Sequence, residues 1–307
     1  MGYKLAGFEV LGNVEIDEAV NAMYVKNHHP KYNYNMDLRD FNALTDIPEE
    51  LYGIDILDGS PPCSTFSTAG QREKGWGVEK QFKEGQKYQR LDDLFFVFLE
   101  TVKKLQPKVV IAENVPGLLI GNAKGYVHEI INVFHETGYE VQIFKLNSVT
   151  MVVPQRRERV FFIGNRLNYP KLRLDFSYPV IKFGEVRTEH GKEFASTDGK
   201  NQRLLEQARP TDKSIADVRE RLGMKGSGFN TSIVADTEIA PCMIAEGSKF
   251  RLYDRKYFSE GDYINVQTFP QDYDFCGKNV QYVCGMSVPP VMMAQIATKI
   301  WEQRLRA

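Results

Sequence analysis

Short apolar runs alternate with amphipathic stretches through the first half of the chain, the pattern of a sheet wound with helices. Strands are expected at 8–14, 52–57, 109–112 and 139–145. In 91–105 the apolar residues recur at helical spacing, which indicates a helix with one buried face. A second helix is expected over 127–137, where Gly138 would end it. Crossovers of this kind favour parallel strands, so we predict a doubly wound α/β sheet that binds ligands at the carboxyl ends of its strands.

The pattern changes near residue 170, where Lys, Arg, Glu, Gly, Ser and Thr become common and the periodicity weakens. This change is typical of an inserted second domain. Order returns near 269–273, and a last helix over 291–304 carries an apolar face that we expect to pack back on the first sheet. The predicted organisation is a first domain over 1–172, a smaller second domain over 173–254, and a returning segment over 255–307.

Composition is that of an ordinary globular protein with a full core, at 307 residues, 42% hydrophobic and 26% charged. No apolar stretch approaches the roughly 18 residues of a membrane span, and no signal peptide is evident, so we expect a cytoplasmic protein without membrane contact. The four cysteines form no CxxC pair, which predicts reduced thiols and no metal site. A net charge of −1 argues against non-specific binding along a polyanion, but it is compatible with a locally basic cleft.

Three polar clusters follow or open expected strands. Residues 59–67, Gly-Ser-Pro-Pro-Cys-Ser-Thr-Phe-Ser, place Cys63 on a proline-stiffened loop directly after a strand. Glu113 follows four apolar residues and precedes Asn-Val-Pro, and the run Gln-Arg-Arg-Glu-Arg at 155–159 opens another strand. Taken singly, each cluster has an ordinary interpretation: an inert cysteine, a glutamate facing water, or a solvated basic edge.

Together the three clusters resemble the DNA cytosine methyltransferases of bacteria and phages, which methylate carbon 5 of cytosine. The resemblance covers most of 1–164 and about 255–307, and it leaves the middle unmatched, as the family's variable DNA-reading domain would be. It implies a Rossmann-like, S-adenosylmethionine-dependent fold with a mixed sheet. The domain over 1–172 would then be catalytic and cofactor-binding, and the domain over 173–254 would recognise the target.

Cytosine carbon 5 is a poor nucleophile, so its methylation needs transient addition of a thiolate at carbon 6, the role that the resemblance implies for Cys63. A carboxylic acid bonded to ring nitrogen 3 and the exocyclic amine would stabilise the intermediate, and Glu113 resembles that residue. Arg157 and Arg159 alternate with an acidic residue and are expected to point to one side. The resemblance places them near the flipped base and the glutamate. Residues 64–87 are expected to form a lid.

S-adenosyl-L-methionine, converted to S-adenosyl-L-homocysteine, is the cofactor that the resemblance implies. Glu15 follows the early strand, and a carboxylate at a strand end can bond a ribose diol. The run at 285–290 looks like the family's Gly-Asn-Ser-Val-Pro block, with Met286 in place of the asparagine. The expected cofactor contacts are Glu15, Ile16, Asp37, Leu38, Pro62, Leu94, Ser287 and Val288.

Two stretches depart from the family. Members begin with a strand and a Phe-x-Gly-x-Gly-Gly turn that cradles the methionine end of the cofactor, whereas 1–7 resembles the family's segment just after that turn. We therefore expect a start-site truncation, exposed sheet edges and poor cofactor binding. In the middle domain, 240–245 resembles the stretch around a Thr-Leu or Thr-Ile pair that touches the target, but Cys242 and Met243 stand there instead.

The leading prediction is an enzyme that flips a cytosine out of double-stranded DNA, attacks it with Cys63, transfers a methyl group and then removes the proton at carbon 5. It would act as a monomer in a restriction-modification system, with a cognate restriction endonuclease as a possible partner, or in phage DNA modification. Alternatives are methylation of transfer RNA and a catalytically impaired DNA-binding remnant. A nicotinamide-dependent oxidoreductase would need a GxGxxG turn after the first strand, and the sequence has none.

Overall fold

The structure is a computed structural model that describes residues 1–61, 93–120, 124–195, 199–228 and 231–306. Its contacts divide the chain into two compact units. The large-sheet unit comprises 9–146, 158–174 and 298–307. The small-sheet unit comprises 1–8, 147–157 and 175–297. The predicted boundaries at 172 and 254 stay a prediction, and each unit is described separately below.

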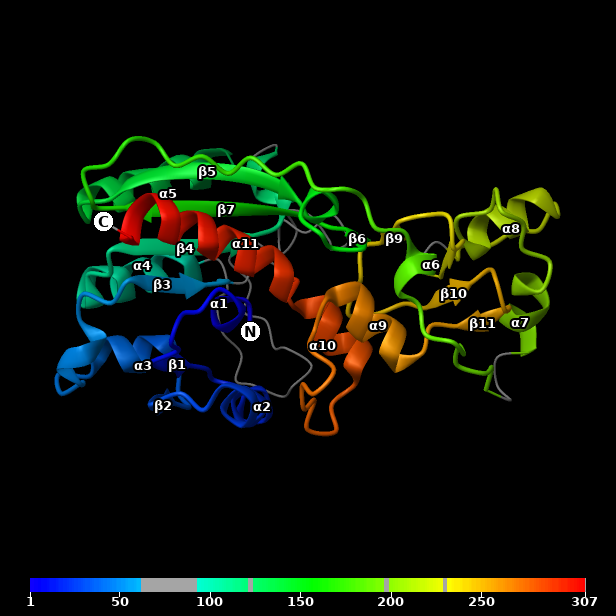
Figure 1. The fold of residues 1–307 in the computed structure, drawn as a ribbon, viewed down its shortest axis with the longest axis horizontal. Coiled ribbons are helices and arrows are strands. Elements are labelled where there is room, and N and C mark those ends of the chain that lie inside the picture. Colours follow the sequence, from blue (N-terminus) through cyan, green and yellow to red (C-terminus); the bar gives the residue numbers. More distant parts are fainter. Residues whose placement is uncertain (62–92, 121–123, 196–198, 229–230, 307) are drawn as a thin grey trace. The chain divides into compact units, whose positions relative to one another are not determined.

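The large-sheet unit is built on a mixed sheet. Its strands, in spatial order, are β3 (Ile56–Gly59), β4 (Val109–Asn114), β7 (Glu158–Asn165) and β5 (Glu140–Asn147), side by side in Figure 1. β3 and β4 are parallel, with Gly59 opposite Ala112. β7 runs antiparallel to β4, with Glu113 opposite Phe161. The predicted α/β class is therefore confirmed, and the sheet is mixed.

Helices cover one face of this sheet because their apolar residues recur at helical spacing. α4 (Leu94–Leu105) and α5 (Lys124–Glu136) bury Phe95 and Phe134 against a sheet face that carries Ala112 and Phe162. Phe95 meets Phe162 edge to face, with ring centroids 5.3 Å apart. Each such side chain stabilises the fold by roughly 1.5–3 kcal/mol on burial. α5 ends as predicted, since Gly138 has φ 89°, a conformation that favours glycine.

A second, two-stranded sheet belongs to the same unit. β1 (Gly12–Val14) pairs in parallel with β2 (Tyr32–Tyr34), shorter than the strand expected at 8–14. α2 (Glu18–His28) joins the two strands, and its first turn is capped by Asp17, whose carboxylate accepts from the Val20 amide at 2.8 Å. α3 (Leu38–Ala43) follows β2. Within the described residues β1 pairs only with β2, and β3 pairs only with β4.

The small-sheet unit contains two small sheets of very short strands. One sheet has the order β11 (Lys256–Tyr257), β10 (Lys249–Arg251) and β8 (Ser232–Val234), and the other pairs β6 (Gln155–Arg156) with β9 (Ala240–Pro241). Its helices are α1 (Gly2–Leu5), α6 (Phe183–Val186), α7 (Gly199–Leu205), α8 (Ile215–Arg221), α9 (Glu260–Gln267), α10 (Val280–Met286) and most of α11 (Pro290–Ile300).

Two features hold the small-sheet unit together. α7 and α8 pack on β8 and β10 through a buried cluster that includes Leu205, Val218 and Phe250. Arg251 and Asp262 form a fully buried ion pair at 3.1 Å, which links β10 to the first turn of α9. Because an unpaired buried charge is very costly, this pair fixes how α9 attaches to the sheet. No helix among the described residues has both the length and the apolar character needed to cross a membrane.

Candidate active site

Glu113 and Arg159 form an ion pair at one end of the large sheet. Arg159 Nε lies 2.8 Å from Glu113 Oε1, and the two side chains are 15% and 14% exposed. The register explains the pair: Glu113 faces Phe161 across β4 and β7, so Arg159 is its diagonal neighbour on the same face. The carboxylate is thus held in one orientation while its edge remains reachable from solvent.

A hydrogen bond connects the chain just after the neighbouring strand β3 to the end of β4. The Asn114 side chain donates to the Pro61 carbonyl at 3.1 Å, and Pro61 is the last residue that the structure describes before residue 93. β3 itself approaches α4 closely, since a Cβ at Gly59 would lie 2.6 Å from the Phe98 ring. The sequence therefore leaves β3 beside Glu113 and reaches Cys63 two residues after Pro61. Cys63, Pro62 and the expected lid at 64–87 lie outside the described residues.

Arg157 has other partners than Arg159. Its side chain is 1% exposed, Nη1 donates to the Met243 carbonyl at 2.7 Å, and Nη2 donates to the Gly285 carbonyl at 2.9 Å. Arg159, in contrast, binds Glu113. The expectation that both arginines point to one side of an extended segment stays a prediction, because their partners belong to the two separate units. A direct contact of Arg157 with a base has no support in this geometry.

Sequence reasoning did not single out Gln155 as a site residue, yet it is fully buried and bonded at both ends. Its Oε1 accepts from the Met243 amide at 2.8 Å, and its Nε2 donates to Gln267 Oε1 at 2.6 Å. Gln267 in turn donates to the Ser287 carbonyl at 2.7 Å. Only the glutamine's place in the run 155–159 could have drawn attention to it, because its partners lie more than 80 residues away.

Two of the expected cofactor residues follow β1 directly. Glu15 Oε1 accepts from the Asp17 amide at 2.8 Å, and the Glu15 carbonyl accepts from Asn35 at 2.7 Å. Ile16 is 37% exposed, so part of its apolar surface is accessible next to the strand end. A fixed carboxylate beside an open apolar surface suits a ribose hydroxyl pair and an adenine face.

The other expected contacts have defined surroundings where the structure describes them. Asp37 caps α3 by accepting from the Arg39 amide at 2.8 Å, and Arg39 also pairs with Asp93 at 2.8 Å, directly before α4. Leu38 and Leu94 are half-buried at the first turns of α3 and α4. In the small-sheet unit, Ser287 and Val288 are half-buried after α10, the Ser287 hydroxyl donates to Val283, and Met286 is 58% exposed. Their contacts with the cofactor stay a prediction.

The thiols and the acidic groups show no metal-binding arrangement among the described residues. Cys242, Cys276 and Cys284 form no disulfide bond among the described residues. Burial raises the pKa of the Cys284 thiol to about 12, so this cysteine stays protonated and unreactive.

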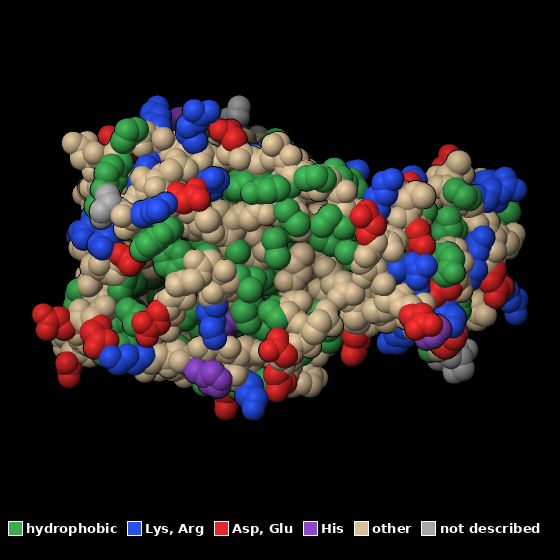
Figure 2. Space-filling model, in the orientation of Figure 1, with side chains coloured by type: hydrophobic (Ala, Val, Ile, Leu, Met, Phe, Trp, Pro, Cys, Tyr) green, Lys and Arg blue, Asp and Glu red, His purple; other side chains and the backbone are tan. Residues whose placement is uncertain are grey.

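Some of the basic side chains in the middle of the chain are paired with acids. Arg221 binds Asp212 at 2.7 Å and Lys213 binds Glu238, while Arg203 is exposed. Figure 2 shows blue and red side chains mixed over the visible face.

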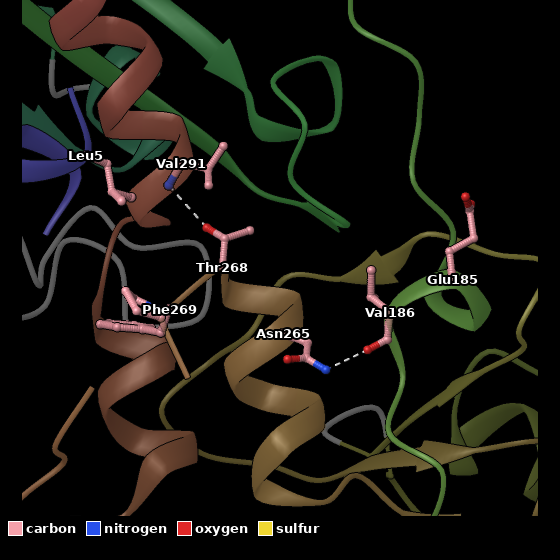
Figure 3. Close-up of a pocket in the computed structure, with 8 residues that line it drawn as sticks. Leu5, Glu185, Val186, Asn265, Thr268, Phe269 and Val291 are labelled. Atoms are coloured by element: carbon pink, nitrogen blue, oxygen red, sulfur yellow. Dashed lines mark hydrogen bonds between the residues drawn. The ribbon is translucent and has the colours of Figure 1, made fainter. Parts of the chain in front are cut away.

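A shallow hollow of about 560 Å³ lies within the small-sheet unit. In Figure 3, Leu5 and Val291 stand on one side of it and Glu185 and Val186 on the other. The Glu185 carboxylate already accepts from the Lys182 amide at 2.7 Å, as part of a helix cap. Its lining residues include no lysine or arginine, so this hollow does not suit a phosphate group.

Comparison with known proteins places these features in context. The sequence model of the family described as C-5 cytosine-specific DNA methylase matches residues 1–302. Type II methyltransferase M.FnuDI of Fusobacterium nucleatum is 34% identical over 59% of this chain and 47% of its own length. Type II methyltransferase M.Sau96I of Staphylococcus aureus is 28% identical over 97% of this chain and 72% of its own length. Orphan methyltransferase M.SPRI of Bacillus phage SPR is 33% identical over 52% of this chain and 33% of its own length. The chain thus spans about half the length of M.FnuDI.

Solved structures show the same fold at low sequence identity. A prophage-encoded E. coli protein described as a DNA modification methyltransferase superimposes with a TM-score of 0.68 at 17% identity, over 98% of this chain and 94% of that one. The DNMT2 of Spodoptera frugiperda gives 0.65 at 15% identity, over 98% and 95% of the two chains. These likenesses establish the α/β methyltransferase fold.

Proposed function

Because the chain belongs to the family of C-5 cytosine-specific DNA methylases, we propose that it methylates carbon 5 of cytosine in double-stranded DNA. The type II and phage relatives favour a role in restriction-modification or in phage DNA modification. A cognate restriction endonuclease and action as a monomer belong to the same proposal.

The observation that carries this proposal is the Glu113–Arg159 pair beside the end of β3. A carboxylic acid can donate to ring nitrogen 3 of cytosine, and a guanidinium group that holds its other oxygen fixes the acid in that orientation. The chain that leaves β3 at Pro61, bonded to Asn114, reaches Cys63 two residues later. Glu113 thus lies near the carboxyl end of β4, and Cys63 follows the carboxyl end of β3 in the sequence. Because β3 and β4 are adjacent and parallel, this is the edge of the sheet where ligands are expected to bind.

These groups can perform the ring chemistry in balanced steps. The Cys63 thiolate adds to carbon 6, Glu113 in its protonated form gives a proton to nitrogen 3, and carbon 5 becomes a nucleophile. S-adenosyl-L-methionine, when bound, supplies an electrophilic methyl group. Loss of the proton from carbon 5 to water then expels the thiolate, and nitrogen 3 returns its proton to Glu113, which restores the ring. Extrusion of the cytosine from the duplex must come first, since carbon 6 is inaccessible within the stack.

Residues of the large-sheet unit fit the methyl donor. Ile16 exposes an apolar surface directly after β1, and the Glu15 carboxylate beside it is held by a backbone amide. Asp37, Leu38 and Leu94 are the further contacts that we propose there, and Ser287 and Val288 are proposed from the small-sheet unit.

The sharpest test of the proposed function does not depend on the methyl donor. Addition of a thiolate at carbon 6 lets carbon 5 take up a proton from water, and elimination then releases the original hydrogen. We expect the chain to release tritium from duplex DNA labelled at cytosine carbon 5, and Cys63→Ser to release none. Transfer RNA with the same label serves as the second substrate. Release from transfer RNA alone would overturn the DNA assignment, and no release from either would overturn the enzyme.

A further inference from the structure

The chain just after β7, in the large-sheet unit, has no regular secondary structure, yet side chains bond its backbone. The Leu172 amide donates to Gln142 Oε1 at 2.7 Å, and the Leu172 carbonyl accepts from Gln142 Nε2 at 3.1 Å. Gln303 makes the same two bonds with the Arg173 amide and carbonyl, at 3.0 and 2.9 Å. The backbone that follows Lys171 is thus fixed, while Lys171 itself is exposed.

Arg304, in the π-helix Trp301–Leu305, bonds the same stretch through a buried guanidinium group. Its Nη2 donates to the Pro170 carbonyl at 2.6 Å and its Nη1 to the Gln303 carbonyl at 2.8 Å. Arg304 is 5% exposed, its Nε is buried without a hydrogen-bond partner, and no acid that the structure describes pairs with it. Guanidinium groups stay charged in proteins, although burial lowers the pKa of this one. The two carbonyls offset part of the cost of burying this charge, and a nearby anion would offset more.

Other cations lie close to Arg304 along the chain, although the net charge of the whole protein is −1. Lys171 directly follows the residue whose carbonyl Arg304 bonds, and Arg306 lies two residues after Arg304. Both are exposed, and neither forms an ion pair within the part of the chain that the structure describes. Glu302, the nearest acid in the sequence, pairs with Lys299 at 2.9 Å. This surface therefore carries an excess of positive charge.

Two exposed aromatic rings accompany these cations. Tyr169 is 39% exposed, and its ring centroid lies 5.9 Å from the guanidinium carbon of Arg304. Trp301, on the π-helix that carries Arg304, is 45% exposed. A nucleic acid strand offers phosphates for the cations and flat sugars and bases for the rings, whereas a free phosphate ion would use the cations alone. The combination favours a nucleic acid as the ligand.

The segment that carries Lys171 leaves the large sheet at the end opposite Glu113. Val109 begins β4 and pairs with Asn165, the last residue of β7. Glu113 lies four residues further along β4, roughly 13 Å away at about 3.3 Å per residue. Figure 1 shows the C-terminus beside the end of the sheet where β7 ends. The cations are therefore separate from the acid of the proposed active site.

We propose that Lys171, Arg304 and Arg306, with Tyr169 and Trp301, form a second DNA-binding surface that takes phosphate backbone outside the target site. This inference rests on the proposed function, because DNA that carries the target cytosine also supplies these phosphates. Lys171 and Arg306 bind phosphates directly, and the buried Arg304 adds a fixed positive charge beneath them. Contacts with phosphates and sugars read no base sequence, so this surface raises affinity for any DNA.

Hydroxyl-radical footprinting of the protein tests where the DNA lies. A duplex made only of A·T pairs is the probe, because it contains no cytosine to be flipped. We expect saturating duplex to lower the oxidation of Tyr169 and Trp301 severalfold. Tyr52, which is 45% exposed in the same unit, is the matched control and should be oxidised as in the free chain. Equal oxidation of Tyr169 and Trp301 with and without duplex would overturn the inference.

Charge variants test the phosphate contacts by fluorescence anisotropy with the same duplex. Lys171→Gln and Arg306→Gln should each bind about tenfold more weakly at about 100 mM salt, because one phosphate contact is lost. The slope of log affinity against log salt concentration should also become shallower by about one in each variant. Lys26→Gln is the control, since Lys26 is exposed on α2 of the same unit, and it should change neither quantity. Equal losses in all three variants, or none in the first two, would overturn the inference.

Two further measurements separate this inference from its alternatives. Millimolar inorganic phosphate at constant ionic strength should leave the A·T duplex bound. If phosphate displaces the duplex and restores the oxidation of Tyr169, the surface takes a free phosphate ion and the DNA partner is overturned. Tritium release reports the proposed function separately, because the A·T duplex needs no turnover. Protected rings without tritium release would overturn the enzyme alone, and tritium release with unprotected rings would overturn this surface alone.

Discussion

Replacing Glu113 by glutamine tests the centre of the proposed site. The variant keeps the shape of the side chain but cannot give a proton to ring nitrogen 3. Loss of a positioned general acid typically lowers a rate by two to four orders of magnitude, equivalent to about 3–5 kcal/mol of barrier. We therefore expect Glu113→Gln to release tritium about a hundredfold to ten-thousandfold more slowly.

The structure also limits how much this variant should destabilise the protein. Arg159 loses the charge that now lies 2.8 Å from its Nε, in a site where the side chains are 15% and 14% exposed. Exposed pairs contribute about 0–1 kcal/mol, and breaking a buried pair costs about 3–5 kcal/mol. For this intermediate exposure we expect a loss of about 1–2 kcal/mol. Because domains are stable by roughly 5–15 kcal/mol, the variant remains folded and the rate loss reports chemistry.

Glu158→Gln is the matched control, as it removes the same charge one residue from Arg159. Glu158 pairs with Lys145 at 2.9 Å, and these side chains are 45% and 50% exposed. Tritium release and urea denaturation of both variants give the comparison. The control should keep its rate and lose less than about 0.5 kcal/mol. A rate for Glu113→Gln within tenfold of the unaltered chain would refute the assignment of this carboxyl group.

Three further changes have definite expected outcomes. Cys63→Ser should abolish tritium release and leave duplex affinity in anisotropy unchanged; measurable release would remove the nucleophile assignment. Burial lowers the pKa of Lys249, whose long hydrogen bond to Ser232 is 3.3 Å, so Lys249→Met should resist urea better at pH 7. That advantage should shrink toward pH 10, because the unaltered protein gains stability as pH rises from the lowered pKa toward 10.5; a less stable variant at pH 7 would contradict the reasoning. Gly59→Ala should cost about 1–3 kcal/mol in denaturant titrations because its Cβ would meet the Phe98 ring at 2.6 Å, and an additional Phe98→Leu change should recover part of that loss; an unchanged midpoint would contradict it.

The long elements of the large-sheet unit were predictable because their apolar pattern is strong. The run at 109–112 became β4, with exposures of 0–1%, and the helical spacing in 91–105 became α4. The small-sheet unit has strands of two or three residues, too short to show an alternating pattern. Its buried Arg251–Asp262 pair also gave no signal, since charged residues are ordinarily assigned to the surface.

In the candidate site, too, contacts that follow from a regular strand were predictable, and contacts between distant segments were not. Glu113 and Arg159 were predicted as neighbours, and the antiparallel register of β4 and β7 brings them together. The partners of the second arginine, Arg157, are the Met243 and Gly285 carbonyls, which lie 86 and 128 residues away along the chain and gave no local signal. The bonds of Gln155 join segments more than 80 residues apart, and local sequence contains no information about such partners.

The two arginines of one short run bind different groups. β6 ends at Arg156 and β7 begins at Glu158, and Arg157 between them still pairs through its backbone, since its carbonyl accepts from the Ser148 amide at 3.0 Å. Its guanidinium then satisfies two backbone carbonyls, at Met243 and Gly285. Arg159, inside β7, must lie on the face that carries Glu113. A lysine can replace neither arginine fully, because each uses the fixed geometry of the guanidinium group, and the losses should appear in stability against urea for Arg157 and in rate for Arg159.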